Sequence, residues 1–222
     1  MKRILLSILT FGAFILTVQG QTVTTTLDNT NSEKDEYFRI GIKGGLNFSN
    51  LINDKDGKTK ISFHGGLSAE FFVIDKFSIQ PELLYSRQGA KANLKDYVWG
   101  VGYSEIEADL KLDYINIPVM FKYYPIEGLS LQVGPQIGFL VNAVMDSSTS
   151  VFGSKYDSSE DVKDQIEAVD LGMNLGVGYE FSEGVFFDIR YNLGLKKVNK
   201  ELASGESNVK NGVFQLSVGL RF

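Results

Sequence analysis

The last nine residues of the chain alternate strictly between two kinds of side chain. Every second residue is apolar, and these are Phe214, Leu216, Val218, Leu220 and Phe222. The residues between them are polar or small, and these are Gln215, Ser217, Gly219 and Arg221. Because side chains of a β-strand point to opposite faces with a period of two, we predict a strand with one face in an apolar medium.

Seven further segments show the same alternation. With the last one, they cover residues 38–49, 62–73, 77–88, 113–124, 129–143, 168–181, 185–195 and 214–222. Each is long enough to cross a bilayer as a tilted strand, which takes about 9–11 residues. The chain therefore carries eight candidate membrane-spanning strands.

The connections between these segments alternate in length. Three are tight and lie at residues 74–76, 125–128 and 182–184, whereas four are long and polar and lie at 50–61, 89–112, 144–167 and 196–210. Short periplasmic turns and long external loops are typical of outer-membrane barrels. We therefore predict an all-β fold, an eight-stranded antiparallel up-and-down transmembrane β-barrel with both ends in the periplasm.

The alternative is a soluble eight-stranded barrel of the lipocalin kind, with the apolar face inside. Several glycines share the polar phase of the strands, and these are Gly41, Gly45, Gly66, Gly134, Gly138, Gly172, Gly176, Gly178 and Gly219. An eight-stranded interior is barely wide enough for side chains. Glycines make room there for long charged side chains, whereas the many Phe, Leu, Ile and Val residues would overfill it. The pattern favours the membrane barrel.

The N-terminal residues have the composition of an export signal. Lys2 and Arg3 precede an apolar run over residues 4–18, and small or permissive residues follow at the expected cleavage position. We predict a signal peptide at 1–20, a polar periplasmic segment at 21–37 and a barrel domain at 38–222. The chain contains no Cys, which excludes a lipid-anchored cysteine, disulfides and thiolate metal sites. Its net charge of −5 disfavours nucleic-acid binding.

Five stretches carry a resemblance to a known family. They are residues 41–49 (GIKGGLNFS), 81–89 (PELLYSRQG), 112–124 (LDYINIPVMFKYY), 134–138 (GPQIG) and 190–195 (RYNLGL). They resemble the PorT-like outer-membrane β-barrel family over about residues 38–222. The resemblance implies a place in a Gram-negative outer membrane. It also implies that the terminal strand, with Phe222, Leu220 and Val218, is an assembly signal for the barrel-insertion machinery.

His64 is the only histidine and lies near the external end of a predicted strand. Ser62 and Ser68 share its face, and Asp113 is expected at a similar height. Some eight-stranded outer-membrane barrels modify lipid A with a His and a Ser at the outer rim, so a lipid A acylase or deacylase centred on His64 is the alternative function. A hydrogen-bonded or solvated rim histidine is the favoured interpretation, and we expect no enzyme activity and no catalytic residue.

Residues 53–57 (NDKDG) have the composition of a calcium-binding loop. Aligning Gly57 with the invariant glycine of an EF-hand places Ile52 at the first ligand position and Phe63 at the twelfth, and neither supplies an oxygen. We expect a turn here, and no metal or cofactor. The acidic loop 144–167 could meet lipopolysaccharide through divalent cations, although a solvated loop is favoured. Trp99, between Tyr97 and Tyr103, could lie in the lipid interface or meet an external partner.

Charged residues of both signs share the polar phase of the strands. They are Lys43, Glu70, Glu82, Lys122, Glu180, Asp188, Arg190 and Arg221. An unpaired charge away from bulk water is costly, so we expect these residues to pair in the lumen. The favoured interpretation is a polar core that holds the barrel shut, and the alternative is an ion path or small pore. We therefore predict a structural or interaction protein that contacts outer-membrane lipids, lipopolysaccharide and an envelope protein partner through external loops.

Overall fold

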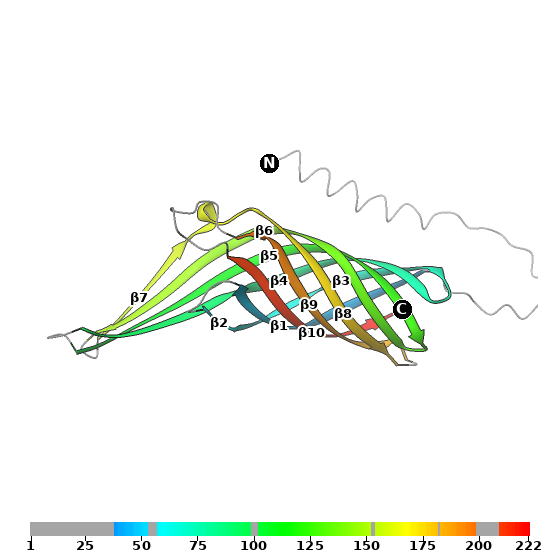
Figure 1. Cartoon of the computed structure of the whole chain (residues 1–222), viewed down its shortest axis with the longest axis horizontal. Coiled ribbons are helices and arrows are strands. Elements are labelled where there is room, and N and C mark those ends of the chain that lie inside the picture. The colour runs from blue at the N-terminus through cyan, green and yellow to red at the C-terminus, as the bar shows by residue number, and fades with distance from the viewer. Residues whose placement is uncertain (1–37, 53–56, 99–101, 152–153, 182, 199–208) are drawn as a thin grey trace, which may run out of the picture. The chain divides into compact units, whose positions relative to one another are not determined.

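The computed structural model describes residues 38–52, 57–98, 102–151, 154–181, 183–198 and 209–222 (Figure 1). The predicted signal peptide, the polar segment 21–37, Trp99 and most of the loop at 53–57 lie outside these residues. The strands are β1 (Phe38–Ile52), β2 (Gly57–Lys58), β3 (Lys60–Ile74), β4 (Phe77–Val98), β5 (Gly102–Ile126), β6 (Leu129–Val151), β7 (Ser154–Asp161), β8 (Val169–Glu180), β9 (Val185–Lys197) and β10 (Lys210–Arg221). A 3₁₀ helix, η2, covers Lys163–Gln165. No helix in the described part of the chain is long and apolar enough to span a membrane.

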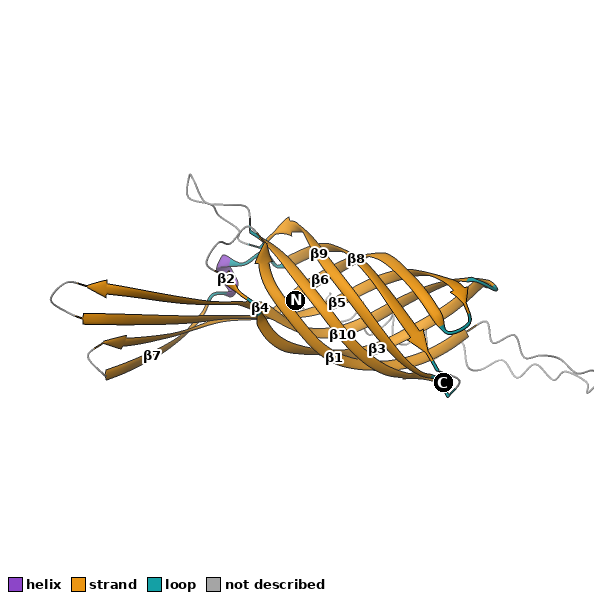
Figure 2. Cartoon of the chain, turned by 60° about the horizontal axis from the view of Figure 1, so that its bottom comes forward, coloured by secondary structure: helices purple, strands orange, loops and turns teal. Residues whose placement is uncertain are grey.

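Eight of these strands form a closed antiparallel ring (Figures 1 and 2). The order is β4-β3-β1-β10-β9-β8-β6-β5, and β5 pairs with β4 to close the circle. β1 and β10, the first and last of these strands along the chain, pair without a bulge from Gly41↔Arg221 to Ile52↔Lys210. The predicted eight-stranded up-and-down barrel is confirmed.

The two phases of each strand lie in different environments. The outward phase is apolar and exposed, as Leu83 (51% exposed) and Phe187 (51%) illustrate. The inward phase is polar and buried, as Lys43 (6%) and Arg190 (2%) illustrate. A soluble barrel would bury its apolar phase, so the lipocalin-like alternative is wrong, and the exposed apolar wall needs a lipid environment.

Two inward-facing glycines permit the close approach of neighbouring strands. A Cβ on Gly66 of β3 would lie 2.0 Å from the carbonyl oxygen of Leu83, and a Cβ on Gly45 of β1 would lie 1.8 Å from that of Leu216. No side chain fits at either distance. Glycine on the polar phase therefore allows backbone packing as well as room for long side chains.

The structure corrects the prediction of two long external loops. Residues 89–112 and 144–167 are largely strand, because β4 and β5 continue their pairing up to Val98↔Gly102 and β6 pairs with β7 from Val144↔Asp161 to Val151↔Ser154. Gly57 and Lys58 of β2 pair with Ala92 and Lys91 of β4. We call this extension the projecting sheet; it comprises β2, 89–98 of β4, 102–111 of β5, 144–151 of β6, and β7. Figure 2 shows β7 and the long strands beside it running beyond the barrel.

Candidate functional site

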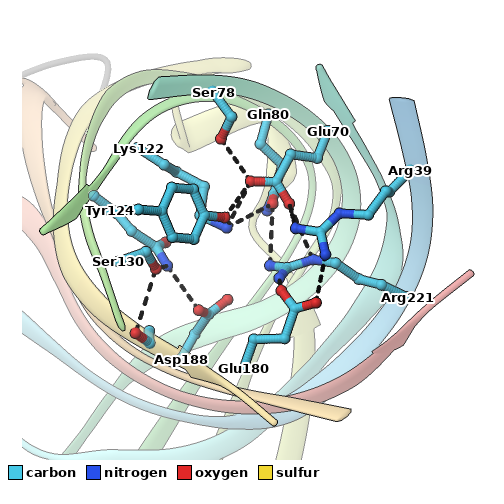
Figure 3. Close-up of polar contacts among 12 residues, drawn as sticks. Arg39, Glu70, Ser78, Gln80, Lys122, Tyr124, Ser130, Glu180, Asp188 and Arg221 are labelled. Atoms are coloured by element: carbon cyan, nitrogen blue, oxygen red, sulfur yellow. Dashed lines mark hydrogen bonds and ion pairs between the residues drawn. The ribbon is translucent and has the colours of Figure 1, made fainter. Parts of the chain in front are cut away.

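At the end of the barrel where the tight turns lie, Glu70 on β3 is surrounded by donors (Figure 3). Its side chain is 1% exposed. Its carboxylate lies 3.0 Å from Nη2 of Arg39, 3.0 Å from Nζ of Lys122 and 3.2 Å from Nε of Arg221. The hydroxyls of Ser78 and Tyr124 also donate to it. Three cations and two hydroxyls thus compensate one buried carboxylate.

Glu180 on β8 joins the same group from the opposite wall. Its carboxylate lies 2.5 Å from Nη1 of Arg39 and also pairs with Arg221. Arg39 and Tyr124 were not among the predicted lumenal residues. The signal that could have found them is their phase, since each stands at an even spacing from a predicted inward residue of its strand, Lys43 and Lys122 respectively. We call Arg39, Glu70, Lys122, Tyr124, Glu180 and Arg221 the periplasmic cluster.

A second group of charges, the central cluster, comprises Lys43, Glu82, Asp188 and Arg190. Arg190 holds Glu82 in a bidentate pair, with Nη1 at 2.9 Å and Nη2 at 2.8 Å from the two carboxylate oxygens. Its Nη2 also lies 3.1 Å from Asp188. Lys43 Nζ lies 3.0 Å from Asp188 and 3.6 Å from Glu82. All four side chains are at most 1% exposed.

Two inward-facing glutamines outside the predicted charge network extend these clusters. Gln80 accepts from Lys122 at 3.2 Å and donates to Glu82 at 2.6 Å, so it links the periplasmic cluster to the central cluster. Gln132 accepts from Nε of Arg190 at 2.9 Å and donates to Asp188 at 2.8 Å. The structure places all eight predicted lumenal charges in these two clusters, each with at least one partner of opposite sign.

His64 lies in a buried amide-rich layer and not at a solvated rim. Nδ1 is 2.8 Å from Oδ1 of Asn47, and Nε2 is 2.8 Å from Oγ of Ser217. The amide nitrogen of Asn47 donates to two backbone carbonyls and to Ser86, so its oxygen faces His64 as an acceptor. Nδ1 therefore carries the proton, and Nε2 accepts from the hydroxyl of Ser217.

The residues predicted beside His64 are not brought to it. Ser62 donates to the carbonyl oxygen of Arg87 at 2.6 Å. Asp113 accepts from Nε of Arg87 at 2.6 Å and from Nη2 at 3.0 Å. Within the described residues, His64 is hydrogen-bonded to Asn47 and Ser217 and to none of the predicted partners. Ser217 was predicted on the polar phase of the last strand but not as a partner of His64, because the two residues are 153 apart in the sequence.

An apolar group closes the other end of the interior, where a polar lumen was predicted. This apolar cap consists of Leu112, Tyr114, Leu140, Ala143, Val162, Ile166 and Val198. The first four lie on β5 and β6, and the other three follow β7 and β9. The backbone N–H of Val162 donates to Ala143 at 3.1 Å, and that of Glu167 donates to Val198 at 2.7 Å. The chain after β7 is thereby fixed to the barrel rim with its apolar side chains buried.

The projecting sheet carries a polar cavity of about 670 Å³. It is lined by Lys58, Lys91, Ala92, Asn93, Glu107, Ala108, Asp109, Asp146, Ser147, Ser148, Asp157, Ser158 and Ser159. Asp109 is paired with Lys60. Asp146 is paired with Lys111 and accepts from Ser159 at 2.7 Å. The hydrogen bond from Lys111 lowers the pKa of the Asp146 carboxyl in this external part of the chain.

Over the described ranges, no group of three or more His, Cys, Asp or Glu side chains is arranged to hold a metal ion. Residues 53–56 lie outside those ranges, and Gly57 begins β2. Tyr97 and Tyr103 are paired across the β4–β5 hairpin in the backbone register.

The three candidate assembly residues lie on or directly after the strand that closes the barrel. Val218 and Leu220 pair with Gly44 and Ile42 of β1 and are exposed on the outer wall. Phe222 is 70% exposed, and its backbone N–H donates to Ile40 at 2.8 Å.

With a closed barrel, an apolar wall and a filled polar interior in place, the class of protein is an integral membrane β-barrel. The model of the family described as outer membrane protein beta-barrel domain matches residues 20–200. The chain belongs to this family, and its location is the outer membrane.

Solved structures with a similar fold include several outer-membrane proteins. The attachment invasion locus protein Ail of Yersinia pestis is 17% identical, with a TM-score of 0.45, and the match covers 83% of this chain and 98% of that one. Neisserial surface protein A is 17% identical, with a TM-score of 0.45 and coverage of 83% and 97%. The N-terminal barrel of OprF from Pseudomonas aeruginosa is 15% identical, with a TM-score of 0.34 and coverage of 83% and 97%. No curated protein matches the chain.

Proposed function

We propose that the protein is a non-conducting, non-enzymatic outer-membrane barrel that anchors an external interaction surface. The observation that carries this proposal is the filling of the interior. Two ion-pair clusters occupy its periplasmic and central parts, an amide layer around His64 follows, and the apolar cap closes the external end. The projecting sheet is then the part of the molecule that is free to meet envelope partners.

The filled interior supports a closed state because a permeating ion would have to separate buried pairs. Breaking such a pair by removing one partner costs about 3–5 kcal/mol. Planar-bilayer recordings of the purified protein should therefore show no steady conductance, with a porin in the same membrane as the positive control. Steady channels from the purified protein would contradict the proposal and favour a small pore.

One observation favours the alternative of a lipid-modifying enzyme. Ser217, His64 and Asn47 form a chain of hydrogen bonds of the kind that activates a serine nucleophile. The burial of these residues argues against the enzyme. His64 is 3% exposed and Ser217 is 6% exposed, so a lipid substrate would have to pass the barrel wall to reach them. We propose that these hydrogen bonds have a structural role and order the side chains in the middle of the interior. The test compares lipid A from cells that carry the wild type, His64→Ala or Ser217→Ala by mass spectrometry. An unchanged acyl pattern is expected, and a changed one would favour the enzyme.

We further propose that the chain is a PorT-like barrel that contacts outer-membrane lipids, lipopolysaccharide and the barrel-insertion machinery. The runs at 41–49 and 112–124 support placing the chain with the PorT-like barrels. The exposed apolar wall fits contact with outer-membrane lipids and lipopolysaccharide. Val218, Leu220 and Phe222, at the closing strand, suit recognition by the barrel-insertion machinery, and the export pattern at 1–20 supports delivery to it.

A further inference from the structure

The strand β7 has one edge that no described strand covers. It pairs with β6 over eight consecutive residues without a bulge and lies off the path of the closed ring. Its side chains from Lys155 to Asp161 are exposed. In the membrane part of the molecule, closure of the barrel removes all such edges. The projecting sheet is not closed, so β7 presents a row of backbone donors and acceptors to the outside.

The hydrogen-bond pattern shows which backbone groups face this edge. The N–H of Val162 donates to Ala143, and these two residues continue the register of the β6–β7 pair. In an antiparallel ladder, hydrogen-bonded and non-hydrogen-bonded pairs alternate. The residues that bond to β6 are therefore 156, 158 and 160. Lys155, Asp157, Ser159 and Asp161 direct their N–H and C=O groups to the free edge.

The charges along β7 select the partner. Lys155 is the only cation of the strand and pairs with Asp157 at 3.6 Å, which leaves Glu160 and Asp161 as the acidic excess. A second copy of β7 would place this acidic excess against itself, and like charges on paired strands are destabilising. A basic strand is complementary. The cavity described above begins at Asp157, Ser158 and Ser159 and continues to Glu107, so a long basic side chain has room beside the edge and can reach the carboxylates of Asp157 and Glu107. Lys58 and Lys91 lie in the same lining, and Asp109 and Asp146 are already paired with lysines.

The other face of β7 offers an apolar contact. Tyr156 is 67% exposed, and its side chain lies on the face opposite Asp157 and Ser159 because the side-chain period is two. Exposed tyrosines are frequent energetic centres of protein interfaces. An added strand would therefore have backbone pairing, charge complementarity and an aromatic contact at one place.

We propose that β7 is a docking edge to which an extended, basic segment of a partner protein adds as a further strand. This inference rests on the proposed role of the projecting sheet in external contacts and names the chemistry of the partner. Strand addition obtains affinity from main-chain hydrogen bonds and specificity from alternate side chains.

The test uses the full chain in detergent and fluorescent ten-residue peptides. The probe alternates Lys and Val; one control alternates Glu and Val, and the other keeps the Lys–Val sequence but carries an N-methyl group on every residue, so that neither edge of the peptide can donate. The Lys–Val peptide should bind, and both controls should bind about tenfold more weakly or worse in fluorescence anisotropy. Equal binding of the N-methylated peptide, or no binding of the Lys–Val peptide, would overturn the proposal.

A matched pair of variants locates the binding. Both Asp157→Pro and Asp157→Ala remove the carboxylate and its ion pair with Lys155 at 3.6 Å, but only Asp157→Pro also removes the edge N–H, without touching the pairs to β6. We expect about tenfold weaker binding by Asp157→Pro than by Asp157→Ala. Equal affinities of the two variants would show that the peptide binds elsewhere and would refute the docking edge. The peptide controls decide the question even where the proline variant fails to fold. A conducting pore would refute the proposed function, whereas these outcomes refute only the edge.

Discussion

Replacement of Arg190 by Leu is the sharpest test of the filled interior. Arg190 makes four hydrogen bonds in the central cluster, two to Glu82, one to Asp188 and one to Gln132. The substitution fills a similar volume with an apolar side chain. It leaves two buried carboxylates with Lys43 as the one remaining cation of the cluster.

The expected loss in the free energy of unfolding follows from the number of charges in the cluster. The central cluster is balanced in the wild type, with two cations and two carboxylates, and Arg190→Leu leaves one buried negative charge uncompensated. Removing one partner of a buried pair costs about 3–5 kcal/mol. We expect the free energy of unfolding to fall by about that amount in urea titrations of the protein refolded in lipid vesicles, followed by circular dichroism.

The double variant Arg190→Leu with Glu82→Gln is the control. It removes one charge of each sign and leaves Lys43 paired with Asp188 at 3.0 Å, so the balance is restored. We expect the double variant to be more stable than the single Arg190→Leu variant, although it carries more changes. A loss below about 1 kcal/mol in the single variant, or a double variant less stable than the single one, would refute the reasoning.

Three further outcomes are expected. Gly66→Ala should lower stability by about 1–3 kcal/mol in the same titration, because its Cβ meets a carbonyl oxygen, whereas Gly65→Ala, whose nearest contact is 3.5 Å, should change little. Ile166→Ala should cost about 2 kcal/mol by opening the apolar cap, and faster hydrogen exchange near Val198 would locate the loss. Phe222→Ala should lower the amount inserted in cells, measured by heat-modifiable migration, much more than the stability of refolded barrels; equal losses would contradict an assembly signal.

The barrel could be predicted from the sequence because its two faces meet different media. On β10, lipid selects Leu216, Val218 and Leu220, and the packed interior selects Gln215 and Ser217, so the period of two is visible. On β7 of the projecting sheet, the side chains on both faces are exposed, as Tyr156 and Asp157 illustrate. Lys91, Asp109, Asp146 and Ser159 form one continuous row across four strands, yet nothing in their spacing marks them as strand residues.

The interior could be predicted only in part, for a related reason. Phase alone places Lys43 and Arg190 in the lumen, because any charge on the lipid face would be costly. Phase does not say which charge meets which. Arg39 meets Glu180 from a position 141 residues away, and His64 meets Ser217 from 153 residues away. Such pairs depend on the tilt of the strands and on how the ring closes.

The same physics explains why a docking edge could exist only on the projecting sheet. In the hydrocarbon region, an unpaired backbone N–H or C=O costs several kcal/mol, so a sheet there must close on itself. Outside the membrane, water satisfies an open edge at little cost, and a partner strand can replace that water. The eight strands inside the lipid therefore have to pair in a closed ring. Only a strand that lies beyond the lipid, such as β7, can keep one edge unpaired. The acidic side chains of β7 then keep that side from pairing with another copy of itself.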